Sequence, residues 1–151
     1  MNLSRLACFA LAVSLIACAP VQPPKQEMPV ASSVPAPTPA DVVVRINAAQ
    51  DGQSVEVALN QRFAVELVGV PTAGYIWAPA QIPAFVTRAG EASGNTTQAQ
   101  SQPGFAGGNR WEVLMFVATA PGSGELVLEQ RRPWETSEPP TAVFRVTIVA
   151  R

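Results

Sequence analysis

The side chains that most often carry out nucleophilic and acid–base catalysis are nearly missing from this sequence. The 151 residues include no histidine and two cysteines, Cys8 and Cys18. Without histidine the chain cannot form a Ser-His-Asp triad, a Cys-His dyad or a histidine-containing metal site, and two cysteines alone cannot make a zinc cluster. The sequence also contains no cofactor motif. We therefore expect neither a metal nor a cofactor.

Carboxylates are the remaining candidates for catalysis. Glu125 lies four residues before Glu129, and Glu135 lies three before Glu138. Glycoside hydrolysis uses two carboxylates, but they must face each other across a cleft. These glutamates fall in turns or at strand ends, where solvated charges are the simpler interpretation. The sequence thus predicts that the chain is not an enzyme and that its informative residues bind a partner.

The composition predicts one folded domain that does not bind nucleic acid. The formal charge is -1, whereas a nucleic-acid-binding protein of this size usually carries a basic patch. Hydrophobic residues make up 48% and charged residues 14%, so the chain as a whole is not disordered. A chain of this length is normally a single domain.

The first candidate binding loop runs from Pro71 to Tyr75. Pro71 fixes its own backbone φ and Gly74 permits a positive φ, so a tight reversal is expected near Thr72 and Ala73. The tip of this loop would be small and uncharged. The alternative interpretation is a plain hairpin flanked by core aromatic residues, among them Tyr75.

The second candidate loop is rich in glycine. Gly104, Phe105, Ala106, Gly107 and Gly108 follow one another in a stretch with few side chains. Exposed backbone of this kind suits main-chain hydrogen bonding to a partner. The stretch has neither the spacing nor the strand-to-helix context of a phosphate-binding loop. The alternative is a flexible linker, because residues 91–102 just before it are polar.

The third candidate loop contains Arg132, Pro133 and Trp134, placed just after a predicted strand. Tryptophan and arginine are the side chains most enriched among interface hot spots. An exposed tryptophan on a loop indicates that something covers it. The alternative is a tryptophan that packs on its own domain with an arginine stacked on it.

The scaffold that must position these loops has the pattern of an all-β domain. Period-two alternation of β-branched and aromatic residues is the strand signal, and Gly, Pro and Asp turns separate the segments. No stretch shows a helical apolar stripe. About seven short strands predict an immunoglobulin-like antiparallel β-sandwich over residues 41–151. The clearest predicted strands are 41–46, 54–59, 62–67, 111–117, 125–130 and 143–149.

The N-terminal segment has the pattern of a targeting signal followed by a tether. Residues 1–17 carry a positive charge and then a short apolar run that ends in Leu-Ile-Ala before Cys18, as in a bacterial lipoprotein signal peptide. An ordinary signal cleaved nearby is the alternative. Residues 18–40 would be the lipidated Cys18 and a proline-rich tether. These features predict a lipid-anchored protein of the bacterial cell envelope, at the outer membrane and facing the periplasm.

Taken together and in order, the three loops resemble the chagasin family of immunoglobulin-like inhibitors of papain-like cysteine peptidases. The resemblance covers about residues 42–149. It rests on three motifs, which are Pro71-Thr72-Ala73-Gly74-Tyr75-x-Trp77, a Gly107-Gly108 loop ahead of an aromatic strand, and Arg132-Pro133-Trp134-Glu135.

The sequence departs from the family pattern at three places. Val70 stands where the family usually has Asn, and Ala73 replaces the second Thr of a Thr-Thr pair. In the second loop, Phe105-Ala106 precedes the two glycines, and Gly104 is shifted one place upstream. These changes bear on affinity and target preference more than on the fold.

The resemblance implies reversible inhibition without chemistry. The three loops would enter the peptidase cleft as a wedge, with Thr72 near the catalytic cysteine. The loop at Gly107 and Gly108 would pair by its backbone along the cleft. Trp134, positioned by Pro133 and assisted by Arg132, would pack on the opposite wall. The partner would be a papain-like cysteine peptidase, bound by a monomer.

A different class of function is also compatible with the fold. A structural or assembly lipoprotein of the cell envelope could use the same sandwich to hold another protein, because fold alone does not fix function. The two hypotheses differ in one respect: an inhibitor requires Thr72, Gly107 and Trp134 to converge on one end of the domain, and a structural role does not.

Overall fold

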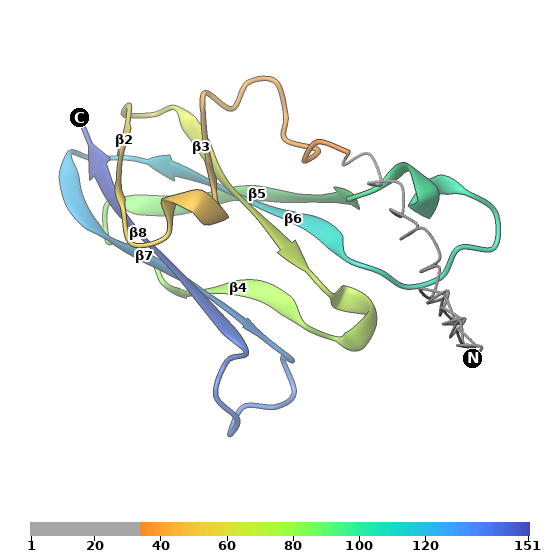
Figure 1. Ribbon diagram of the computed structural model, residues 1–151. Coiled ribbons are helices and arrows are strands. Elements are labelled where there is room, and N and C mark those ends of the chain that lie inside the picture. Colours follow the sequence, from red (N-terminus) through yellow and green to blue (C-terminus); the bar gives the residue numbers. More distant parts are fainter. Residues whose placement is uncertain (1–33) are drawn as a thin grey trace, which may run out of the picture.

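The computed structural model describes residues 34–151 (Figure 1). The predicted signal peptide at 1–17, the predicted lipidation site at Cys18 and the first part of the predicted tether lie outside the described residues. Within residues 34–151, no helix has the length and apolar character needed to cross a membrane.

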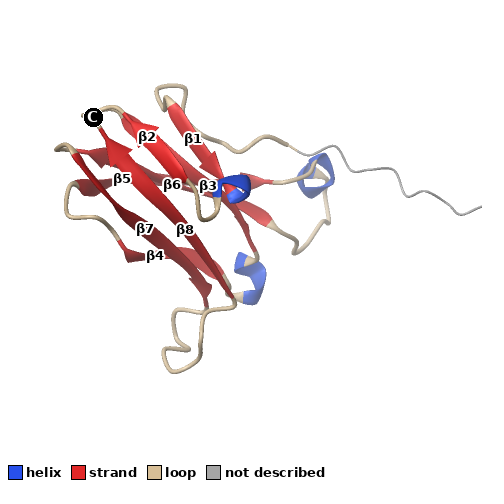
Figure 2. Cartoon of the chain, turned by 60° about the vertical axis from the view of Figure 1, so that its left-hand side comes forward, coloured by secondary structure: helices blue, strands red, loops and turns tan. Residues whose placement is uncertain are grey.

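The domain is a two-layered β-sandwich of eight strands, which confirms the predicted all-β, immunoglobulin-like class (Figure 2). Three single-turn 3₁₀ helices interrupt the strands, η1 (Ala48–Gln50), η2 (Pro71–Ala73) and η3 (Gln98–Ser101). The strands are β1 (Val44–Asn47), β2 (Ser54–Val57), β3 (Arg62–Gly69), β4 (Ile76–Gln81), β5 (Val86–Asn95), β6 (Arg110–Ala118), β7 (Gly122–Arg131) and β8 (Ala142–Ala150).

Each sheet has four strands, in the orders β1-β3-β6-β5 and β2-β8-β7-β4. The prediction that both sheets are antiparallel is wrong at two strand pairs. β1 pairs with β3 in parallel, and β2 pairs with β8 in parallel. The chain crosses from the first sheet to the second at β2 and returns at β3. The chain reverses once between β1 and β2 and again between β2 and β3. β3 therefore runs in the same direction as β1, beside which it lies.

One strand lies where the sequence shows no strand pattern. The polarity of residues 91–102 suggested a flexible linker in the glycine-rich loop that follows, but these residues are themselves ordered, since Glu91–Asn95 complete β5 and Gln98–Ser101 form η3. β5 is an edge strand in which only Val86 is buried, so it lacks the apolar alternation of a half-buried strand. A bulge near Gly90, at φ +125°, further breaks its period.

The core lies between the two sheets. The rings of Phe63 in β3 and Phe116 in β6 stack with centroids 5.6 Å apart. As predicted, Phe63, Val65 and Leu67 are buried on one face of β3. Facing them are the buried apolar side chains of the other sheet, Leu126, Leu128, Phe144, Val146 and Ile148.

The outer face of the β1-β3-β6-β5 sheet is covered by residues 34–42, which we call the N-terminal strap (Figure 2). The Trp111 indole N–H donates to the carbonyl oxygen of Val34 at 2.7 Å, and the Val34 amide donates to Thr96 at 2.8 Å. Val42 is buried against Met115 and its neighbours. Residues 34–40, predicted as the end of the tether, therefore pack on the domain.

Candidate functional site

The three candidate loops leave the same end of the sandwich. In the first sheet Gly69, the last residue of β3, pairs with Arg110, the first residue of β6, which also pairs with Asn95 at the end of β5. In the second sheet Ile76 at the start of β4 pairs with Arg131 at the end of β7. The β3–β4, β5–β6 and β7–β8 loops thus share one end, and the β3–β4 loop lies between the other two (Figure 1).

The β3–β4 loop is a closed turn. The amide of Val70 donates to the carbonyl of Tyr75 and the amide of Tyr75 donates back, both at 3.2 Å. Pro71 begins η2, and Gly74 ends it at φ +84°. The expected tight reversal is therefore present. It leaves Thr72 and Ala73 exposed at the tip.

The β3–β4 and β7–β8 loops touch each other through Arg132. Its Nε–H donates to the carbonyl oxygen of Ala73 at 2.9 Å, and its guanidinium lies 4.5 Å from the centre of the Tyr75 ring. Its Nη1–H also donates to Glu135 at 2.8 Å, which raises the pKa of Arg132 and keeps it cationic. Because Arg132 contacts both Ala73 and Tyr75 of the first loop, its geometric role is to join two loops.

Trp134 stands at the corner of a turn. The Glu135 amide donates to the Arg132 carbonyl at 3.0 Å, and this places Pro133 and Trp134 at the two central positions. Trp134 is 68% exposed. One edge of its indole touches Gly74, where a Cβ would overlap the ring. The alternative that Trp134 packs away on its own domain does not describe it.

The β5–β6 loop has an ordered base and an exposed tip. The Gln100 side chain donates to the carbonyl of Asn109 at 2.6 Å and accepts from the amides of Thr96 and Thr97 at 2.6 and 2.9 Å. Beyond this base the glycines adopt positive φ. The predicted residues of this loop are all exposed, namely Phe105, Ala106, Gly107 and Gly108. Within residues 34–151, no side-chain hydrogen bond joins this loop to the other two.

Neither of the two glutamate pairs considered for catalysis consists of two carboxylates free of ion pairs. Glu135 and Glu138 line a shallow cavity of about 210 Å³, but Glu135 is bound to Arg132. Glu129 is ion-paired with Arg131. Both pairs therefore have the solvated or paired character expected of surface charges.

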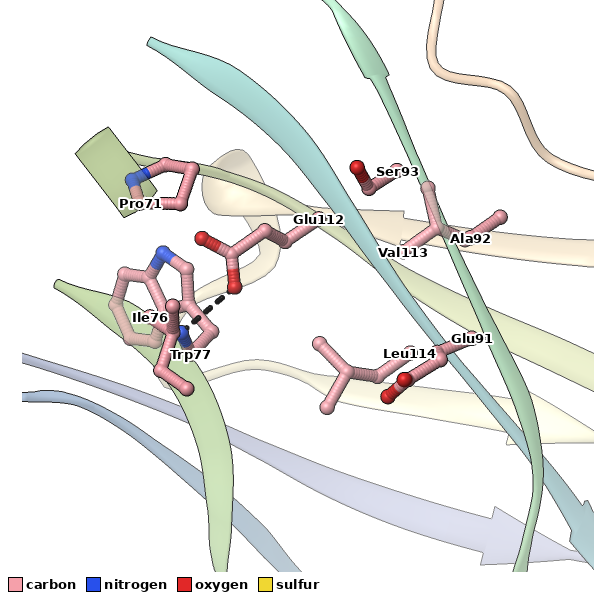
Figure 3. Close-up of a pocket in the computed structure, with 9 residues that line it drawn as sticks. All are labelled: Pro71, Ile76, Trp77, Glu91, Ala92, Ser93, Glu112, Val113 and Leu114. Carbon is pink, nitrogen blue, oxygen red and sulfur yellow. Dashed lines mark hydrogen bonds between the residues drawn. The ribbon is translucent and has the colours of Figure 1, made fainter. Parts of the chain in front are cut away.

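A residue that sequence reasoning missed lies under the first loop. Glu112 in β6 points into the space between the sheets, and its Oε2 accepts the hydrogen bond of the Trp77 amide in β4 at 2.8 Å (Figure 3). Its Oε1 is buried and has no hydrogen-bond partner within residues 34–151. A cavity of about 470 Å³ opens beside it, between the edges of β4 and β5.

The family of the chain follows from its sequence match. A sequence model described as chagasin family peptidase inhibitor I42 matches residues 56–148, which span β2 to β8. The chain belongs to the chagasin family. None of the curated protein sequences compared with the chain matches it.

Solved structures share the chagasin-like fold. The cysteine protease inhibitor EhICP2 from Entamoeba histolytica is similar with a TM-score of 0.62 and 17% identity, covering 76% of this chain and 100% of that one. The solution structure of amebosin is similar with a TM-score of 0.57 and 21% identity, covering 72% of this chain and 97% of that one. At these identities the likeness shows the fold.

The departures from the chagasin pattern leave the first loop closed. Val70 makes its turn hydrogen bonds through its backbone, and so does Ala73 in accepting from Arg132. A different side chain at either position therefore keeps the geometry.

One feature of the sequence could have identified Glu112 as a buried charge. It lies at a core-facing position of the alternation that continues at Leu114 and Phe116.

Proposed function

We propose that this chagasin-family chain is a reversible inhibitor of papain-like cysteine peptidases and has no catalytic activity of its own. The observation that carries the proposal is the join between the first and third loops. Arg132 holds Ala73 and Tyr75, and Trp134 lies against Gly74, so two loops form one continuous surface at the end of the domain.

The first loop would lie over the catalytic cysteine. Its tip, Thr72 and Ala73, is small, exposed and uncharged, so it can enter a narrow cleft. The reciprocal hydrogen bonds between Val70 and Tyr75 fix the turn before binding, which lowers the entropy lost on association. A turn closed in this way does not present an extended peptide for cleavage.

The other two loops would grip the walls of the cleft. Trp134 supplies a large apolar surface that is held in place by Pro133 and by its contact with Gly74. The exposed backbone around Gly107 and Gly108 offers main-chain hydrogen bonds on the other side. Phe105, which is 47% exposed, adds an aromatic ring beside Gly108. Such a surface fits an interface of the common size of about 1,600 Å².

The envelope-scaffold alternative lacks an observation in its favour. It required no convergence of Thr72, Gly107 and Trp134, and the loops that carry them leave the same end of the sandwich.

We further propose, from the sequence of residues 1–18, that a lipid on Cys18 anchors the inhibitor in the bacterial envelope as a monomer.

The direct test is a titration of the chain from residue 19 to 151 against papain, with trypsin as the control enzyme. This form keeps every described residue. Stoichiometric and reversible loss of papain activity, with trypsin unaffected, is the expected result. Full papain activity at micromolar inhibitor, repeated with several papain-like enzymes, would reject the proposal.

A further inference from the structure

We propose that Glu112 is the positioning residue that holds the β3–β4 loop in its binding geometry, by accepting the hydrogen bond of the Trp77 amide across the gap between the two sheets. The inhibitory consequence of this role rests on the proposed function. The anchoring itself is a property of the free chain and can be measured without a peptidase.

The need for an anchor arises from the place of β4 in its sheet. β4 is an edge strand, paired with β7 on one side only. Amides on its free side lack a strand partner, and Trp77 is the second residue of β4, two positions after Tyr75. Glu112 reaches across from the other sheet and supplies the acceptor at 2.8 Å (Figure 3).

Trp77 is fastened at two points. Besides the bond from its amide to Glu112, its indole Nε1–H donates to the carbonyl of Val68 at 3.0 Å. Val68 lies near the end of β3, and Glu112 lies near the start of β6. Trp77 thereby ties the exit of the first loop to the two strands at which the first loop begins and the second loop ends.

Gly69 in β3 leaves room for the Glu112 carboxylate because it has no side chain. A Cβ on Gly69 would overlap Oε1 of Glu112, so a side chain at this position would push the carboxylate away from Trp77. Gly69 has no positive φ, which means that its backbone conformation does not itself require glycine. The close approach of Glu112 gives a physical reason for glycine here.

The carboxylate is held in an environment that does not favour its charge. Burial raises the pKa of Glu112, the Trp77 amide acts in the opposite direction, and the nearby Glu91 raises the pKa further. Among residues 34–151, Glu91, itself paired with Arg88, is the only other titratable residue lining the cavity, since β3 and β4 contribute none. Glu112 is therefore poorly explained as a stabilising charge, and its contact with Trp77 is what it provides.

The anchoring is tested by amide hydrogen exchange on the chain from residue 19 to 151. Glu112→Leu keeps the bulk and removes the acceptor, so amides of residues 70–77 should exchange about tenfold faster, while those of β7 and β8 keep their rates. Glu112→Gln retains an acceptor oxygen and should keep slow exchange. Gly69→Ala, which displaces the carboxylate, should reproduce the effect of Glu112→Leu.

Glu91→Gln is the matched control, because it removes the other carboxylate of the cavity without touching Trp77. It should leave exchange in residues 70–77 unchanged. Equal exchange in the wild type and in Glu112→Leu, or an acceleration spread evenly over the whole domain, would overturn the anchoring role. Fast exchange in Glu112→Gln would also overturn it, since the acceptor would then not be the cause.

The inhibitory consequence is read from papain inhibition constants. Glu112→Leu should weaken inhibition about tenfold at unchanged circular dichroism, and Glu112→Gln should restore it. If the wild type inhibits and Glu112→Leu inhibits equally well, the positioning role fails and the proposed function stands. If the wild type does not inhibit but exchange responds selectively, the proposed function fails and the anchoring stands.

Discussion

The Arg132 guanidinium lies over the ring of Tyr75, 4.5 Å from the ring centre, although 57 positions of sequence separate the two residues. The same guanidinium donates to Ala73 at 2.9 Å. A cation stacked on an aromatic face and bonded to a backbone carbonyl fixes two loops relative to each other. This contact makes the two loops a single preformed surface.

Trp134→Ala is expected to weaken papain inhibition about 30-fold, which corresponds to about 2 kcal/mol. The indole is 68% exposed, so its removal takes little from the folded core. The melting temperature should therefore stay near that of the wild type. Inhibition constants and thermal unfolding on the same preparation check both parts. An unchanged inhibition constant in a folded Trp134→Ala protein would remove this side chain from the interface.

Gly74→Ala is expected to weaken inhibition about tenfold, because the new methyl group overlaps the indole of Trp134 and displaces it. The substitution also strains the backbone, since Gly74 has φ +84°. Gly52→Ala is the matched control: Gly52 has φ +71° but nothing near its Cβ position. Both variants should lose about 1 kcal/mol of stability, and Gly74→Ala alone should lose inhibition. Equal inhibition by the two would contradict the contact.

Removal of residues 34–40 of the N-terminal strap is expected to destabilise the domain. A chain that begins at Asp41 lacks the bonds from Trp111 to Val34 and from Val34 to Thr96, and the contact between Thr38 and Glu66. At about 1 kcal/mol for each hydrogen bond, the loss is about 2–3 kcal/mol. Urea unfolding of chains that begin at Asp41 and at residue 30 measures it. Identical midpoints would show that the strap contributes nothing.

Glu112→Gln is expected to stabilise the protein at neutral pH. Burial raises the pKa of Glu112, so between its ordinary value and the raised one the folded chain holds a proton that the unfolded chain releases. Stability from this group is therefore present at low pH and is lost as the pH rises through the folded pKa. Glutamine removes that loss.

The check is the melting temperature of both proteins across the acidic-to-neutral range. The advantage of Glu112→Gln should be largest at neutral pH and should shrink as the pH falls. A wild-type advantage at neutral pH would mean that the charged hydrogen bond to Trp77 outweighs the desolvation of the carboxylate.

The sequence predicted the scaffold because its signals are local. Alternation in β3 placed Phe63, Val65 and Leu67 on one buried face, as observed. The turn at Pro71–Gly74 followed from fixed and permissive φ values at two residues. β5 was missed because its residues are small or polar and only Val86 is buried, so the strand shows no apolar alternation. The parallel pairing of β2 with β8 brings together segments that are about 90 residues apart in the sequence, so no local pattern could predict it.

By itself, the sequence determined the all-β class, the excluded chemistries and the three loops with their motifs, since these depend on residue types and short-range conformation. The tertiary structure alone decided how the loops act together. It placed Arg132 on Tyr75, Trp134 against Gly74 and Glu112 under Trp77. Each is a contact between residues far apart in the chain, brought together by strand register and by the packing of one sheet on the other.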